Sequence, residues 1–169
     1  MKSTKLTAMH TSMLRIVDEA YEKKAWHGPN LKGSVRGVTA SQASWLPARD
    51  RHSIWDIVNH TAYWKYAVRQ RLVGGKRGAF SKKGSNWFAR PSSQQETAWK
   101  HDVALLDDMH RDLRSAIASL PPGLDLHKKV PGSKSSYFTL IFGVAAHDLY
   151  HAGQIQLLKR LQKKEGRKS

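Results

Sequence analysis

Hydrophobic residues recur at steps of three and four positions in four long stretches of this chain, which is the period of an amphipathic α-helix. The stretches cover about residues 4–24, 53–72, 93–120 and 137–163. Glycine or proline follows the first three, as expected where a helix stops. The first stripe runs through Leu6, Met9, Met13, Ile16 or Val17, and Ala20. The fourth runs through Leu140, Val144, His147, His151, Ile155, Leu158 and Leu161.

Capping signals support these starts. A Ser or Thr followed three residues later by an acidic or amide residue is typical of a helix N-terminus, because each side chain binds the other's backbone N–H. One such pair predicts a short extra helix in the first connector, and the other two predict the starts of the second and third long helices. The pairs are Thr39 with Gln42, Ser53 with Asp56, and Ser93 with Glu96.

The segments between the first three helices are long. Residues 30–52 join the first helix to the second, and residues 75–92 form a loop with Phe80, Trp87 and Phe88 among Gly, Lys and Ser. Loops of this length are uncommon unless they are functional or packed by their own side chains. One or both of these connectors is expected to cross the helical assembly instead of making a tight turn.

Four amphipathic helices can bury their stripes only against one another, so we expect an all-α fold, an antiparallel four-helix bundle. The chain has 169 residues, which fits a single domain spanning residues 1–169 with a real core. The basic tail, about residues 163–169, is expected to fray. No internal repeat and no alternating strand pattern is present in the sequence.

Composition narrows the chemistry. The chain has no cysteine, which excludes disulfides and thiolate ligands and leaves His, Asp, Glu or water for any metal site. No apolar run approaches the roughly 20 residues of a membrane span, so no membrane partner is expected. Without a signal-peptide pattern at the start of this sequence, the expected location is the cytoplasm.

The formal net charge of +16 favours anionic partners such as nucleic acid or acidic metabolites. Residues 75–90 interleave cations with aromatic residues, as single-strand binders do. No helix-turn-helix or other nucleic-acid-binding motif is present in the sequence, and the charges are dispersed along the chain. A basic protein without a specific anionic partner is therefore the simpler interpretation, and nucleic-acid binding is an alternative.

Three of the nine histidines are the candidate site. His147 and His151 lie four residues apart, so they share one face of the fourth helix, and that face is its apolar stripe. His60 borders the inward face of the second helix. Buried imidazoles need partners, and neutral imidazole is a common metal ligand. Three histidines would leave positions open for water or substrate, although hydrogen-bonded core histidines are the alternative.

The remaining histidines carry less weight. His110 falls near the third stripe and is a candidate core residue, and His27 lies in a turn between tryptophan and glycine. The others occupy polar or loop positions: His10, His52, His101 and His127. Candidate bases near the three histidines in sequence are Asp56, Asp148 and Tyr150. The spacing places Asp148 about 100° around the helix from His147, in a supporting role or a salt bridge.

The two histidine segments resemble those of the DinB-like (DinB/YfiT) superfamily. Residues 53–64, SIWDIVNHTAYW, are similar to its first histidine motif, and residues 145–155, AAHDLYHAGQI, to its C-terminal HxxxH motif. Residues 25–29, AWHGP, and 38–43, VTASQA, also resemble family sequence. The resemblance covers most of the chain.

This resemblance implies an up-down-down-up four-helix bundle, often a homodimer. It implies one divalent metal ion, nickel or zinc most often, with iron also suited to three imidazoles. Carried over by position, the ligands are His60, His147 and His151. Characterised relatives include thiol-dependent S-transferases, in which the metal binds a low-molecular-weight thiol.

The leading hypothesis is therefore a metal-dependent enzyme that acts on a small molecule, as a thiol-dependent S-transferase or a hydrolase. Cations near the site could hold an anionic thiol, and the candidates are Lys65, Arg69, Lys82 and Lys83. One alternative is a basic nucleic-acid-binding protein. The other is a metal-binding family member without catalytic activity. The sequence identifies neither the substrate nor a general base.

Overall fold

A computed structural model describes residues 7–75, 80–89 and 95–165 of the chain. Within these residues the structure is all-α, with six helices and no β-strand. Four helices are long, and the two short ones lie in the first connector. The helices are α1 (Ala8–Tyr21), α2 (Leu31–Val35), α3 (Ala40–Ser44), α4 (Ile54–Leu72), α5 (Glu96–Ala118) and α6 (Tyr137–Glu165).

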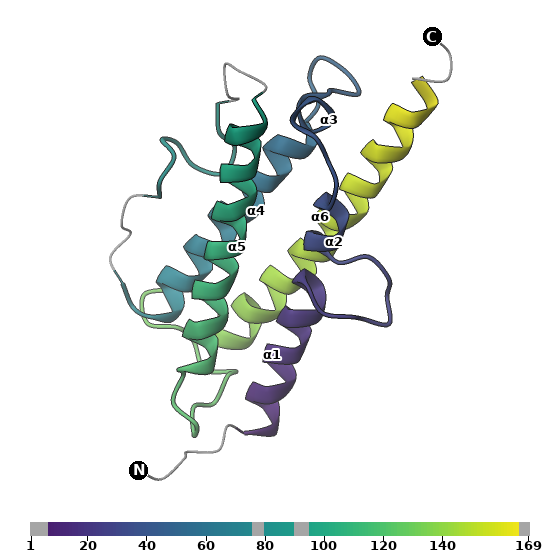
Figure 1. The fold of residues 1–169 in the computed structure, drawn as a ribbon. Coiled ribbons are helices and arrows are strands. Elements are labelled where there is room, and N and C mark those ends of the chain that lie inside the picture. Colours follow the sequence, from purple (N-terminus) through teal and green to yellow (C-terminus); the bar gives the residue numbers. More distant parts are fainter. Residues whose placement is uncertain (1–6, 76–79, 90–94, 166–169) are drawn as a thin grey trace.

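The four long helices pack side by side around a common apolar interior (Figure 1). α4 contacts α5 and α6, and α1 also contacts α5 and α6, while the short α2 packs on α6. None of the helices in the described residues has the length and hydropathy that a membrane crossing requires. The most deeply buried apolar side chains come from all four long helices, among them Val17, Ile54, Trp55, Leu106, Leu113, Ile117, Ile141 and Ile155.

Two of the predicted capping boxes are confirmed. The Ser53 hydroxyl accepts the backbone N–H of Asp56 at 3.1 Å, and the Asp56 carboxylate accepts that of Ser53 at 2.9 Å. Thr39 and Gln42 exchange the same pair of hydrogen bonds at the start of α3. Because both boxes satisfy N–H groups that the helix itself leaves unpaired, they fix where α3 and α4 begin.

The third predicted box is wrong. α5 begins at Glu96 with Gln95 as its N-cap, and Ser93 lies outside the described residues. The Glu96 carboxylate instead accepts the backbone N–H of Ala40 at 2.7 Å. This acidic side chain therefore serves the N-terminus of a neighbouring helix, α3, where negative charge is favourable. The connector helix α2 was not predicted.

The apolar stripes are largely confirmed within the described residues, which do not include Leu6, with corrections at the ends. Met9 is 42% exposed, whereas His10 is completely buried, so the inward face of α1 begins at position 10 and not at position 9. Assigning His10 to a polar position was therefore wrong. Leu161 is 38% exposed because it lies in the last turns of α6, which project beyond α1 in Figure 1.

Candidate metal centre

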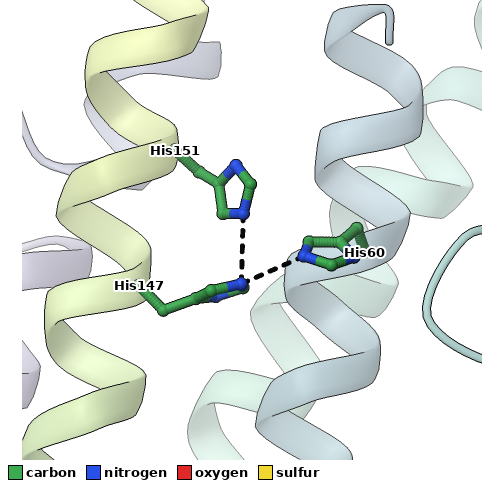
Figure 2. Close-up of side chains that lie close together, drawn as sticks. All are labelled: His60, His147 and His151. Atoms are coloured by element: carbon green, nitrogen blue, oxygen red, sulfur yellow. Dashed lines mark hydrogen bonds between the residues drawn. The ribbon is translucent and has the colours of Figure 1, made fainter.

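Three histidines from two helices meet between α4 and α6 (Figure 2). His60 lies in the second turn of α4, and His147 and His151 lie on successive turns of α6. The Nε2 atom of His147 is 3.0 Å from Nε2 of His60 and 3.1 Å from Nε2 of His151. The structure therefore brings together the three histidines that the sequence singled out, as a group able to hold a metal ion.

The loop before α5 orients His60. His60 Nδ1 lies 2.8 Å from the carbonyl oxygen of Asn86, which can only accept, so Nδ1 carries the proton. Asn86 is held in turn by the Trp64 indole N–H, which donates to its side-chain oxygen at 2.9 Å. Asn86 also has a φ of 66°, an uncommon left-handed conformation that asparagine tolerates better than most residues. Sequence reasoning missed Asn86.

A side chain one turn further along α6 orients His151. Its Nδ1 lies 2.7 Å from the Gln154 side-chain oxygen, while the Gln154 amide NH2 donates to the Tyr150 hydroxyl at 3.0 Å. His151 Nδ1 therefore donates, and Nε2 presents its lone pair to the centre. Partners of this kind fix the tautomer and the ring orientation of metal-binding histidines. The spacing of three residues from His151 was the available sequence signal for Gln154.

The converging nitrogens lack enough protons to satisfy one another. With Nδ1 of His60 and His151 donating, neutral rings carry no hydrogen on either Nε2. If His147 Nε2 carries a proton, it can donate to only one of them and leaves the other without a donor; if it carries none, lone pairs face each other in both contacts. In addition, His147 Nδ1 is buried with no hydrogen-bond partner among the described residues. A cation bound to all three Nε2 atoms would remove this repulsion.

The protonation state and the spacing both fit a divalent metal. Burial, followed by the neighbouring histidines, lowers the pKa of His147 to about 3. Burial likewise lowers the pKa of His151 to about 4 and that of His60 below its ordinary value. All three rings are thus neutral at pH 7, the form that binds metals. Two nitrogens bound to one ion at about 2.05 Å lie about 2.9–3.3 Å apart, depending on the coordination angle.

The family model of the DinB superfamily matches residues 25–155. The chain belongs to the DinB superfamily. The matched region includes His60, His147 and His151, so the predicted resemblance is confirmed. No curated protein and no solved structure shows a significant match.

In this DinB superfamily member, a tryptophan of the long loop covers the centre. The Trp87 ring stacks on the His60 ring with centroids 3.9 Å apart, and on the His52 ring with centroids 3.5 Å apart. Loop residues 80–89 therefore support the site, in agreement with the expectation of a functional or self-packed loop. His52, which sequence reasoning gave little weight, holds the tryptophan in place.

A cavity of about 420 Å³ opens on His60 and His147. Its walls are mainly apolar, and the charged side chain among them is that of Arg71. Its volume falls within the range of small-molecule sites. The other lining residues are Trp64, Val68, Asn86, Thr139, Leu140, Gly143 and Val144. The candidate centre is thus accessible to a small molecule.

One predicted anion-holding residue is not at the mouth of the site. Lys65 is fully buried and pairs with Asp148, which is also buried. Lys65 points inward because it follows the same face of α4 as Thr61 and Val68, both of which are buried. Asp148 forms the salt bridge that its position on α6 allowed. Lys65 is therefore not available to bind a soluble anion.

Most of the other candidates are occupied elsewhere. Asp56 belongs to the capping box of α4, and Lys82 pairs with Asp102 at 2.8 Å. Arg69 donates to the neighbouring Gln70 side chain at 2.9 Å. Tyr150 touches the site through His151, with ring centroids 5.0 Å apart. His110 is a buried core residue, as predicted, and exposed positions are occupied by His27, His101 and His127.

Proposed function

We propose that this protein is a metal-dependent enzyme in which His60, His147 and His151 hold one divalent metal ion. The observation that carries the proposal is the convergence of three neutral Nε2 atoms beside a small-molecule cavity. Nickel or zinc is the first choice and iron the alternative, because three imidazoles suit each of them. Three protein ligands leave open positions, which is the pattern of a catalytic centre and not of a closed structural one.

A metal bound there would act as a Lewis acid and lower the pKa of a bound thiol or water. The chain itself orients the ligands through Asn86 and Gln154, and Trp87 shields one side of His60 from water. The apolar cavity binds a small molecule, with Arg71 placed to pair with an anionic group. These features support transfer of a group to or from a low-molecular-weight thiol, or hydrolysis.

Turnover tests this reaction class. Purified protein would be assayed with a panel of thiols and electrophiles, and with ester and amide substrates, before and after removal of metal by a chelator. We expect activity that disappears with the metal, returns on reconstitution, and is absent in His147→Ala. Bound metal without turnover on any substrate would instead favour the non-catalytic family member.

Nucleic-acid binding receives less support from the geometry. Trp87 is stacked between two histidines, and the Phe88 ring packs on Tyr63 and Phe80, so two of the aromatic residues of residues 75–90 already have partners. The net charge of +16 still favours polyanions. This alternative would gain support if the protein bound an oligonucleotide near 0.15 M salt and if that binding weakened steeply as the salt concentration rose.

We also propose the up-down-down-up order of the four long helices. Trp55 and Asn59, both in the first two turns of α4, donate to Asp102 near the start of α5, which supports α4 and α5 running in the same direction. The end of α4 at Leu72 and the start of α5 at Glu96 then lie at opposite ends of the bundle. The colours of Figure 1 agree, with α1 and α6 running opposite to this pair.

A homodimer is the proposed assembly. The described outer face of α6 exposes large apolar side chains, including Phe142 and Leu157, and exposed apolar side chains on one helix are typical of an interface. Light scattering would give the mass in solution. A Leu157→Lys variant should shift the dimer to monomer, and a wild-type protein that is monomeric at all concentrations would contradict the proposal.

A further inference from the structure

A second cavity, of about 750 Å³, contains none of the three histidines. Its walls come from the second half of α4, from the loop segment 80–84 and from the turn at residues 131–135. We call it the basic cavity. Its volume lies in the upper part of the range found for small-molecule sites, and it is far larger than a single phosphate requires.

Cations from three separate segments line the basic cavity. They are Arg71 on α4, Lys83 in the loop and Lys134 in the turn. No Asp or Glu is among the described lining residues, and within the described part of the chain these three side chains form no ion pair. Lys82 differs, because Asp102 neutralises it. Three unneutralised cations in one concavity concentrate positive potential and favour an anion.

Aromatic rings form one side of the same cavity. The Phe80 ring lies 5.5 Å from the Tyr63 ring and 5.4 Å from the Tyr66 ring, centroid to centroid, and all three residues line the cavity. We call them the aromatic wall. Because the three side chains pack on one another, they offer a preformed apolar surface on which a planar ring can pack.

We propose that the basic cavity binds a small molecule that combines a planar ring with at least two negative charges. The ring packs on the aromatic wall, and the charges pair with Arg71, Lys83 and Lys134. The cavity adjoins the candidate metal centre, because Arg71 lines both cavities. The binding contacts themselves do not include the histidines, so this proposal stands independently of metal binding.

Titration calorimetry with ADP as the probe tests the proposal at about 0.15 M salt, where weak long-range attraction is largely screened. ADP carries both features, whereas adenosine has the ring without the charge and pyrophosphate has the charge without the ring. We expect ADP to bind at one site per chain, and each of the two partial probes to bind at least about tenfold more weakly. The measurement uses the full chain.

Matched double variants locate the site. Lys83→Ala with Lys134→Ala should weaken ADP binding about tenfold or more, because each lysine lost removes a charge-assisted contact. Lys163→Ala with Lys164→Ala removes the same charge from the exposed end of α6 and should leave the affinity unchanged. All four lysines are exposed, so both variants should fold. His147→Ala should also retain ADP binding.

Several results would overturn the proposal. Equal weakening in the two lysine variants would show that ADP responds only to the overall charge. Loss of binding in His147→Ala would place the anion at the histidines. If the wild type did not bind ADP, the proposed site would be wrong. If pyrophosphate bound as tightly as ADP, the aromatic wall would have no part in binding. A single-stranded oligothymidylate that binds more tightly than ADP through the same lysines would identify a polymer as the occupant.

Discussion

Two buried polar clusters lie close together between α4 and α6, and they differ in how their groups are satisfied. Lys65 and Asp148 have opposite charges and pair directly. His60 and His147, five residues earlier on α4 and one earlier on α6, present neutral imidazole nitrogens to each other. The charges of the first cluster are balanced within the chain, although Oδ1 of Asp148 is buried without a hydrogen-bond partner among the described residues. The second cluster leaves nitrogen lone pairs without donors, which a metal ion could accept.

The two clusters also differ in their access to solvent. The Lys65 ammonium lies 4.6 Å from the Tyr21 ring centroid, and Tyr21 stacks on His110 at 3.9 Å, so α1 and α5 close the ion pair off from solvent. The histidines instead border a cavity. Burial of polar groups is therefore not sufficient to identify a site. Convergence of like donor atoms beside an accessible cavity distinguishes the candidate metal centre from a structural contact.

The largest expected effect comes from breaking the ion pair. Asp148→Leu leaves Lys65 buried without its partner and should lower the free energy of unfolding by about 3–5 kcal/mol. Lys65→Met combined with Asp148→Leu should recover most of this loss, because an apolar pair of similar volume carries no unpaired charge. Denaturant unfolding measures both. A double variant as unstable as the single one would show that the pair does more than neutralise itself.

The next effect concerns the pH dependence of stability through His110. Burial, followed by nearby cations, lowers the pKa of His110 to about 2 in the folded protein, against about 6.5 when unfolded. Between these values only the unfolded chain binds the proton. The contribution of the neutral His110 to the free energy of unfolding is therefore complete above about pH 6.5. Below that pH, the free energy of unfolding falls by about 1.4 kcal/mol per pH unit.

His110→Phe removes this contribution, because phenylalanine keeps a ring against Tyr21 and does not titrate. The unfolding free energy of the variant relative to wild type should rise by about 2.3 kcal/mol between pH 6.5 and pH 4.5, because the histidine of the unfolded chain is already half protonated at pH 6.5. Denaturant titrations at several pH values in that window provide the measurement, and His127→Phe at an exposed position is the control. Parallel curves for wild type and His110→Phe would contradict the assignment of a neutral buried imidazole.

A smaller effect is expected on metal affinity when a side chain that orients one of the three histidines is replaced. Gln154→Met removes the acceptor for His151 Nδ1 and should weaken metal affinity about 10- to 100-fold, as loss of such partners does elsewhere. Tyr150→Phe, which removes only the partner of Gln154, should change the affinity less. Competition with a metal-chelating dye measures both. Equal affinities in Gln154→Met and wild type would show that the His151 ring needs no external orientation.

The three histidines and the loop residues around them differ in how well the sequence predicts their positions. His60, His147 and His151 lie on apolar helical stripes, and helix periodicity alone places them inward. Asn86 and Trp87 lie in a loop without periodicity, so their contacts with His60 depend on a loop path that no local pattern encodes. Glu96 serves α3 instead of its own helix for a similar reason, since its partner is distant in sequence.

The position of Lys65 was also not predicted from the sequence. Lys65 was a candidate for holding an anion near the site, yet it is fully buried. Its face of α4 points inward, and the facing Asp148 on α6 compensates the burial of its charge. The capping boxes at Ser53 and Thr39, in contrast, are complete within four residues and were predicted correctly. The two boxes that formed were thus predictable from local sequence, whereas the distant partner of Glu96 and the loop contacts of Asn86 and Trp87 were not.

Metal content tests the central claim most directly. Protein purified without a histidine tag would be analysed by elemental analysis, alongside His147→Ala and the exposed control His101→Ala. We expect close to one nickel, zinc or iron ion per chain in wild type and in His101→Ala, and almost none in His147→Ala. A wild type that holds no metal after reconstitution with each ion, or a His147→Ala variant that holds as much as wild type, would contradict it.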